Sequence, residues 1–380
     1  MAVQQYEYAS LYVSHNRPYV DLRVTTNHGY SRMARFLVDT AGMALIFTEA
    51  LVQDLDLPLQ DAPFLFSGTH VFHRFSPPTL SIGLYNLDLT FATALMVVDT
   101  CSLFSGEEVD GILPCGLLSE YCVLFDYPAG VFALAPTCSS TRSGEPVPIS
   151  IHPHSQFLRV QATIAGDQYG LLLDTGASCT MISEAVMRNW EQQFTAWPRA
   201  QAAVGSANMG VPGEEYATMM RIPRATLGSL LLREITVVSR PDGIFEARSS
   251  SFMTAPIVGA LAGNVLKQFR IEIDYRHEMS YWEWCGNSYP YDMDMVGLTL
   301  SLNLDHTYYV MAVSDCNYAS VRQSVQVGDR LLQIDGLVVT GLPLPTVVTA
   351  LQGSPGQHYT LLLEREGELR SVSVATARIV

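Results

Sequence analysis

Lysine is almost absent from this sequence, and charged residues of either sign are scarce. Lys267 is the only lysine, and charged residues make up 16% of the 380 positions against 48% for hydrophobic ones. That balance supports buried cores and argues against a disordered chain. Acidic residues outnumber basic ones by 37 to 22, which gives a net charge of −15 at pH 7. Because nucleic acids bind basic surfaces, we expect no nucleic-acid partner.

Long hydrophobic runs and paired cysteine motifs are also lacking. No window approaches the roughly 18–20 unbroken apolar residues of a membrane span. The start, Met1–Tyr6, has neither the basic nor the apolar region of a signal peptide. The seven cysteines are scattered without a CxxC pair, so we expect no zinc site and no disulfide framework, while one or two disulfides stay possible. We therefore predict no metal and no cofactor.

A first internal repeat lies in two apolar segments that each contain an Asp-Thr pair. Residues 36–52 (FLVDTAGMALIFTEALV) align with residues 171–187 (LLLDTGASCTMISEAVM) at a constant offset of 135 without a gap. In each copy a strand-like run enters a tight turn, followed by a second apolar stretch and a helix. The predicted helix N-caps are Thr48 and Ser183.

A second repeat follows in the same order. Residues 111–127 align with residues 259–275 at an offset of 148, so the second copy carries an insertion of 13 residues between its two blocks. Two ordered, ungapped blocks indicate a tandem duplication. We expect two mainly β domains over 1–142 and 143–286, each with one short helix.

The remaining residues, 288–380, have a different pattern. Short apolar segments flank a turn-rich stretch at Val327–Gly336, helical spacing follows over 345–351, and two alternating strands close the chain. This pattern predicts a separate small α+β domain.

The two Asp-Thr turns suggest a specific chemistry. The pseudo-twofold symmetry of a duplication would bring Asp39 and Asp174 face to face, and two such carboxylates share a proton. A pair of this kind can act as a base on water and as an acid on a leaving amine, without a metal or a covalent intermediate. No Gly-x-Ser-x-Gly motif is present to supply a serine nucleophile.

The motifs resemble a known family of proteases. Asp-Thr-Gly-Ala-Ser at 174–178 resembles the catalytic loop of retropepsin and pepsin-type aspartic proteases, and the second repeat blocks resemble the second half of a retropepsin-like lobe. Residues 288–380 resemble a PDZ domain. Together they resemble bacterial single-chain retropepsin-like proteases with a C-terminal PDZ domain. The fold implied is mainly β, with two pseudo-symmetric retropepsin-like β-barrel lobes and a PDZ-like α+β domain.

The resemblance implies roles for individual residues. Asp39 and Asp174 would hold the nucleophilic water, and the Thr40 and Thr175 hydroxyls would brace the two loops. Further implied residues are Ala41 and Gly176 at the close approach of the loops, Gly68, Thr69, Gly205 and Ser206 as alternative flap candidates, and Val296, Gly297, Leu298, Thr299 and Leu300 as a loop binding a peptide carboxylate.

The sequence departs from the family pattern at the first loop and at one strand of each lobe. Ala41 replaces a glycine, so the backbone there must avoid positive φ or bear strain. The family's hydrophobic-hydrophobic-Gly element reads Ile-Leu-Pro at 112–114. In the second copy it reads Ala-Leu-Ala at 260–262, or Ile-Val-Gly at 257–259 if the register slips.

The predicted function is aspartic endopeptidase activity on a polypeptide lying between the lobes, with the PDZ-like domain binding substrate or a C-terminal peptide. The alternative is a non-catalytic peptide-binding scaffold with a degenerate protease fold. Because one chain supplies both Asp-Thr loops, we expect a monomer. The resemblance implies a periplasmic or secreted location, with a cytoplasmic one left open.

Overall fold

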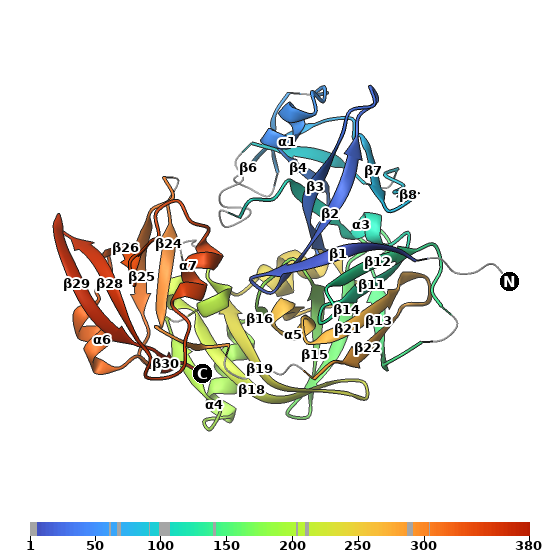
Figure 1. Cartoon of the computed structure of the whole chain (residues 1–380). Coiled ribbons are helices and arrows are strands. Elements are labelled where there is room, and N and C mark those ends of the chain that lie inside the picture. The colour runs from blue at the N-terminus through green and yellow to red at the C-terminus, as the bar shows by residue number, and fades with distance from the viewer. Residues whose placement is uncertain are drawn as a thin grey trace.

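The chain is built mainly from β-strands, which confirms the predicted class (Figure 1). The computed structural model describes residues 6–60, 62–66, 70–90, 92–98, 107–139, 142–202, 204–209, 213–286, 292–303 and 305–380. No helix of this described part is long and apolar enough to cross a membrane.

The first repeat forms strands around a short central parallel pair. β3 runs parallel to β10, and β4 runs antiparallel to β10 and parallel to β9. Its elements are β1 (Glu7–Ser14), β2 (Arg17–Thr25), β3 (Ser31–Asp39), β4 (Leu45–Thr48), α1 (Glu49–Asp54), β5 (Phe64–Phe66), β6 (His70–Arg74), β7 (Thr79–Ile82), β8 (Tyr85–Asn86), β9 (Ala94–Val97), β10 (Gly111–Pro114), α3 (Cys115–Leu118), β11 (Cys122–Asp126) and β12 (Val131–Ala135).

The second repeat has the same pairings. β15 runs parallel to β20, and β16 runs antiparallel to β20 and parallel to β19. Its elements are β13 (Glu145–Ile151), β14 (Leu158–Ile164), β15 (Asp167–Asp174), β16 (Thr180–Ser183), α4 (Glu184–Gln193), β17 (Arg199–Gln201), η1 (Gly205–Ala207), η2 (Glu214–Tyr216), β18 (Thr218–Leu227), β19 (Leu230–Arg240), η3 (Ile244–Arg248), η4 (Ser249–Phe252), β20 (Gly259–Ala262), α5 (Gly263–Leu266), β21 (Phe269–Asp274), η5 (Tyr275–His277) and β22 (Met279–Trp284).

The strand register decides between the two alignments left open at the second repeat. Gly111 lies opposite Phe36 in the first copy, and Gly259 lies opposite Leu171 in the second. Gly111 and Gly259 are related by the offset of 148, and Phe36 and Leu171 by the offset of 135. Residues 260–262 therefore occupy the place of residues 112–114, and the alternative alignment with residues 257–259 is wrong. The predicted N-caps are confirmed, because Thr48 and Ser183 precede α1 and α4 and accept hydrogen bonds from their first turns.

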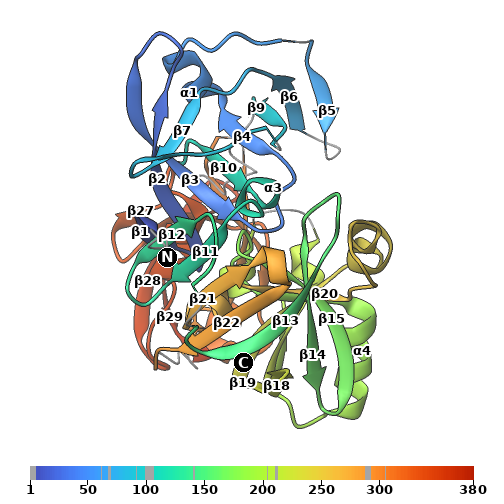
Figure 2. The same cartoon turned by 90° about the vertical axis from the view of Figure 1, so that its right-hand side faces the viewer.

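A sheet shared by the two repeats joins them, in the order β1, β12, β11, β21, β22, β13. Its centre is the antiparallel pair of β11 and β21, in which Leu124 lies opposite Glu272, its own equivalent at an offset of 148. Figure 2 shows these strands between the two units. The pseudo-twofold axis therefore passes between β11 and β21.

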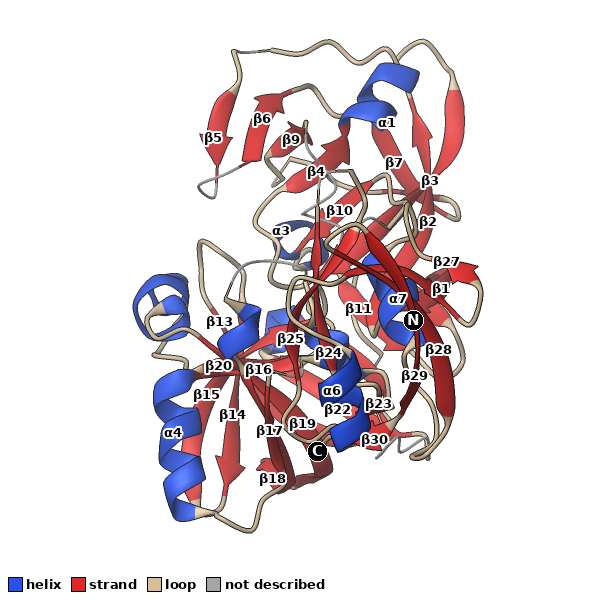
Figure 3. Cartoon of the chain, turned by 90° about the vertical axis from the view of Figure 1, so that its left-hand side faces the viewer, coloured by secondary structure: helices blue, strands red, loops and turns tan. Residues whose placement is uncertain are grey.

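The C-terminal segment forms a separate sheet with two short helices (Figure 3). The sheet order is β24, β25, β26, β28, β29, with β27 paired to β26, and β23 pairs with β30. The elements are β23 (Asp294–Met295), β24 (Leu298–Leu302), β25 (Tyr308–Val313), α6 (Ala319–Ser324), β26 (Arg330–Ile334), β27 (Leu337–Val338), α7 (Leu344–Ala350), β28 (His358–Arg365), β29 (Glu368–Ala375) and β30 (Ala377–Arg378).

This C-terminal segment packs against the second repeat. Met219 and Val238 of the second repeat share one buried hydrophobic cluster with Met295 and Leu298. Arg221, almost fully buried, also donates a hydrogen bond of 2.8 Å to Asp292 and one of 3.0 Å to the carbonyl of Val380. The segment predicted as a separate domain therefore shares its core with the preceding repeat.

The structure places the predicted insertion at one hairpin. Three residues, 67–69, connect β5 to β6 in the first repeat, whereas sixteen, 202–217, connect β17 to β18 in the second. The difference is the predicted thirteen residues. The described part of the longer connection contains η1 and η2 and lies beside the C-terminal segment, against α7 and β25.

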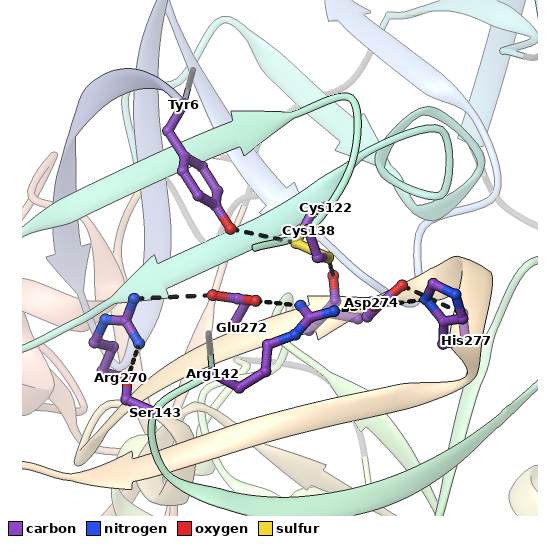
Figure 4. Close-up of polar contacts among 10 residues, drawn as sticks. Tyr6, Cys122, Cys138, Arg142, Ser143, Arg270, Glu272, Asp274 and His277 are labelled. Carbon is purple, nitrogen blue, oxygen red and sulfur yellow. Dashed lines mark hydrogen bonds and ion pairs between the residues drawn. A yellow bond between two sulfur atoms is a disulfide. The ribbon is translucent and has the colours of Figure 1, made fainter. Parts of the chain in front are cut away.

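A disulfide and a buried ion-pair network hold the link between the repeats (Figure 4). Cys122 of β11 bonds to Cys138, sixteen residues later. Arg142 then reaches Glu272 at 2.5 Å and Asp274 at 2.6 Å, two carboxylates that are almost fully buried. The chain leaving the first repeat is thus fixed to β21 of the second.

We predict that replacing both disulfide cysteines, Cys122→Ser with Cys138→Ser, lowers the free energy of unfolding by about 2–4 kcal/mol, because the unfolded chain gains conformational freedom. Urea denaturation measures the change. The control is Cys285→Ser, which removes an exposed free thiol and leaves stability unchanged. Equal stability of the double variant and the control would contradict the prediction.

Candidate active site

The two Asp-Thr turns meet where the repeats join, and their threonines are bonded reciprocally. The Thr40 hydroxyl donates to the carbonyl of Leu173 at 2.6 Å and accepts from the N–H of Thr175 at 3.0 Å. The Thr175 hydroxyl donates to the carbonyl of Val38 at 2.6 Å and accepts from the N–H of Thr40 at 3.0 Å. Both side chains are buried. The four bonds lock β3 and β15 together directly before and after the aspartates.

The aspartates close the same two strands and point into the junction. Asp39 Oδ1 accepts the N–H of Ala41 at 2.8 Å, and Asp174 Oδ1 accepts the N–H of Ala177 at 3.0 Å. A Cβ on Gly176 would lie 2.5 Å from Asp39 Cγ, a distance that no side chain could occupy. The Asp39 carboxylate therefore lies directly against the turn that carries Asp174, and any side chain at 176 would force the Asp39 carboxylate to shift.

Ala41, the departure from the family pattern in the first loop, fits without backbone strain. The sequence predicts that the backbone at Ala41 either avoids positive φ or bears strain. Its φ is not positive, so the backbone avoids the left-handed region. The alanine side chain is half-buried and packs on the hydrophobic core.

Each Asp-Thr turn is tied to the short helix that follows the parallel strand. The N–H of Cys115 donates to the carbonyl of Gly42 at 3.1 Å, and the N–H of Gly263 donates to the carbonyl of Ala177 at 3.0 Å. The two bonds are equivalent under the repeat offsets of 148 and 135. Both turns thus have the same backbone support.

Pro114, which departs from the family pattern in the first repeat, is accompanied by the loss of a hydrogen-bond acceptor nearby. Pro114 and Ala262 lie opposite the two aspartates in their parallel strands. The N–H of Ala262 donates to Thr180 Oγ1 at 3.2 Å, whereas the position equivalent to Thr180 in the first repeat is the apolar Leu45. A proline, which has no N–H, leaves no unpaired donor there.

Burial raises the pKa values of both aspartates, and the charge of Asp39 adds to the rise at Asp174. For Asp39 burial is the main cause, opposed by the N–H of Ala41 and by the positive charge of Arg17. For Asp174 burial is again the main cause, and the negative charge of Asp39 raises the pKa further. The pair therefore binds a proton more tightly than two isolated carboxyls, and Arg17 favours ionisation of Asp39.

Arg17 is a site residue that the sequence analysis missed. It is 7% exposed and forms an ion pair with Glu107, which also accepts a hydrogen bond from Tyr19. The second repeat has no arginine at this place. Val20 of β2 and Val160 of β14 are equivalent, because they lie opposite Phe36 and Leu171, which are related by the offset of 135. Three residues before each valine, Phe157 of the second repeat therefore occupies the position of Arg17. Because Arg17 lies outside both repeat blocks, no pattern in the sequence marked it.

Asn16 and Lys267 form a second contact that was not predicted. The Asn16 side chain at the β1–β2 turn donates to the carbonyl of Ser178 at 2.9 Å and accepts from Lys267 Nζ at 2.7 Å. Asn16 thus ties the first repeat both to the Asp-Thr loop of the second repeat and to the single lysine of the sequence. The rarity of lysine was the only signal of this contact in the sequence.

The structure describes only one of the two pairs of flap candidates. Gly68 and Thr69 lie outside the described residues. Gly205 and Ser206 lie in η1, and Gly205 packs tightly, because a Cβ there would lie 2.5 Å from Met293 Sδ. The hairpin of the second repeat is therefore in contact with the C-terminal segment.

The predicted carboxylate-binding loop is buried, and its N–H donors have partners within the chain. All five residues from Val296 to Leu300 are buried. Val296 donates to the carbonyl of Leu351, Gly297 to Asn317 Oδ1, Leu298 to the carbonyl of Val296 and Leu300 to Asn208 Oδ1, while Thr299 lies in β24 paired with β25. Peptide binding by this loop stays a prediction, and a ligand would have to displace these contacts.

Within the described residues, Cys122, Cys138 and Glu272 are grouped closely enough to share a metal ion. Thiolates are the ligand form of cysteine, and here the two sulfur atoms are joined in a disulfide.

No model of a known protein family matches the chain, and no curated protein matches it. The function is therefore inferred from the geometry of the site.

We predict that Thr40→Val and Thr175→Val each lower the free energy of unfolding by about 2–5 kcal/mol. Each change leaves one buried N–H and one buried C=O without a partner, at about 1–3 kcal/mol per group. Thr40→Ser and Thr175→Ser keep the hydroxyl and are the matched controls. Urea denaturation in which the valine and serine variants unfold together would contradict the proposed brace.

We predict that Asp174→Asn makes the protein more stable at neutral pH. The pKa of this carboxyl is higher in the folded protein than in the unfolded chain, so stability falls as the pH rises above about 4, the ordinary aspartate pKa. The asparagine variant lacks this loss. Thermal melts from pH 4 to pH 8 should show a gap of several degrees that opens with pH. A gap independent of pH, or one equal to that of the exposed control Asp167→Asn, would refute the prediction.

Proposed function

We propose that this protein is an aspartic endopeptidase, with two retropepsin-like lobes formed by the repeats and a PDZ-like C-terminal domain. The observation that carries the proposal is the reciprocal bonding of the buried Thr40 and Thr175, which holds two half-buried aspartates at equivalent ends of β3 and β15. A degenerate pair of lobes would have no reason to keep both aspartates and both threonines in this arrangement.

The electrostatics of the site favour different roles for the two carboxylates. Arg17 favours the ionised form of Asp39, and the charge of Asp39 favours the protonated form of Asp174. Asp39 would take a proton from a bound water as the oxygen attacks the substrate carbonyl carbon, while Asp174 gives its proton to the carbonyl oxygen. The C–N bond then breaks as the leaving nitrogen takes a proton from Asp39 and the new hydroxyl returns one to Asp174. Both carboxyls thereby return to their starting states.

An extended polypeptide is the substrate that this arrangement fits. The hairpins β5–β6 and β17–β18 extend from equivalent positions of the two lobes, and an extended chain could pair with such strands by its backbone. The C-terminal domain would bind a peptide or a partner. The disulfide between Cys122 and Cys138 supports a periplasmic or secreted location, since such bonds persist in oxidising compartments.

We predict that Asp39→Asn and Asp174→Asn each abolish cleavage of an unfolded protein such as reduced, alkylated casein, because each removes one half of the proton transfer. Cleavage is followed by mass spectrometry of the products from pH 3 to pH 8. Asp167→Asn changes an exposed carboxylate of the same strand and should cleave like the wild type. A tenth of the wild-type rate in either variant would count against the mechanism. Absence of cleavage by the wild type at every pH would favour the non-catalytic scaffold.

A further inference from the structure

The space between β24 and α7, next to the loop for which the sequence predicts a peptide carboxylate, is filled by the chain itself, and this space is called the groove below. The occupant is segment 204–209, part of the hairpin connection that is thirteen residues longer in the second repeat. Its helix η1 packs against α7. Val204 and Ala207 lie in one buried hydrophobic cluster with Leu300 of β24 and Val347 of α7.

Asn208 makes the bonds that an added strand would make. Its Oδ1 accepts the N–H of Leu300 at 2.8 Å, and its Nδ2 donates to the carbonyl of the same residue at 2.8 Å. β24 is an edge strand paired only with β25 among the described strands, so Leu300 turns these two groups away from the sheet. One side-chain amide thus replaces the peptide group of a neighbouring strand.

The occupying segment is supported from within the second repeat. Glu214, 3% exposed, accepts from Asn208 Nδ2 at 2.8 Å and from the N–H of Met209 at 2.8 Å. Arg240 lies 3.8 Å from this carboxylate and donates to the carbonyl of Ala207 at 3.0 Å. The second repeat therefore presents Asn208 in a fixed position.

The same hairpin is packed next to the catalytic loop. Ala200 of β17 and Met219 of β18 share a buried cluster with Cys179, five residues after Asp174. A change in how segment 204–209 sits in the groove would therefore act on the wall of the site beside Asp174.

We propose that segment 204–209 is the resident ligand of this groove, and that an extended peptide binds there by displacing it and so releases the β17–β18 hairpin. The proposal deepens the function proposed above, since it assigns a regulator to the same site. Val204 and Ala207 are the buried apolar side chains in the groove, so the displacing peptide carries side chains of valine or alanine size.

The competition has a measurable consequence. A segment tethered beside its groove acts at a high effective concentration, which weakens the apparent affinity of any free peptide. A change that weakens the resident segment and leaves the groove intact should therefore tighten peptide binding. For the loss of the two Asn208 bonds we expect a gain of about tenfold.

The test uses the full-length chain and a fluorescein-labelled peptide that copies residues 199–209. Fluorescence anisotropy compares the wild type with Asn208→Ala and with Gly205→Ala, which places a Cβ against Met293 at a residue of positive φ. Both substitutions lie in the resident segment and leave the residues of β24 and α7 unchanged. Asn303→Ala is the matched control, because Asn303 is exposed and lies next to β24.

We expect the two variants to bind the peptide about tenfold tighter than the wild type and the control, and a peptide with alanine at the place of Asn208 to bind weakly. In the wild type, saturating unlabelled peptide should speed hydrogen exchange of the amides in 204–209. Equal affinities for all four chains, no binding to any of them, or unchanged exchange with peptide bound would each overturn the proposal.

If thermal melting shows that Asn208→Ala does not fold, Gly205→Ala decides the outcome. Neither readout involves cleavage. A chain that exchanges its resident segment for the peptide but cuts no substrate would refute the proposed proteolysis and leave the displacement standing.

Discussion

The reciprocal bonding of two buried threonines is the interaction on which the proposed site depends. Each hydroxyl donates to the strand before the opposite aspartate and accepts from the turn of the opposite repeat. Neither repeat can complete its own turn alone, because the partner for each hydroxyl lies in the other copy. The shared sheet around Leu124 and Glu272 and the contact of Asn16 with Lys267 bring the repeats into the register that these bonds require.

The two halves of the site are equivalent in backbone and different in electrostatics. The strand register, the turn and the helix that supports the turn are repeated, whereas Arg17 is replaced by Phe157 in the second copy. In a perfectly symmetric pair of carboxylates, the shared proton would be bound equally well by either group. The arginine beside one copy breaks that equality and gives the two aspartates separate tasks in the proposed reaction.

The repeats were predictable because duplication leaves two constant offsets in the sequence. The difference between these offsets predicts the length of the insertion, and the strand-like runs and helix starts within the repeated blocks predict the mainly β class and the N-caps Thr48 and Ser183. The structure confirms all three. Contacts outside the repeats left no such trace. The bonds of Asn208 to Leu300 join a side chain to a backbone 92 residues away, and no periodicity or motif records a bond of that kind.

The long sequence separation within the site has a consequence for folding. The threonine brace joins residues 135 apart, and the paired strands at the centre of the shared sheet are related by an offset of 148. Contacts this distant close late, because the entropy of the intervening loop opposes them until both ends are formed. The two carboxylates would therefore come together only after both repeats have folded. Under the proposed function, a nascent chain holding the first repeat alone would carry only one of the two aspartates and could not yet cleave itself or its neighbours.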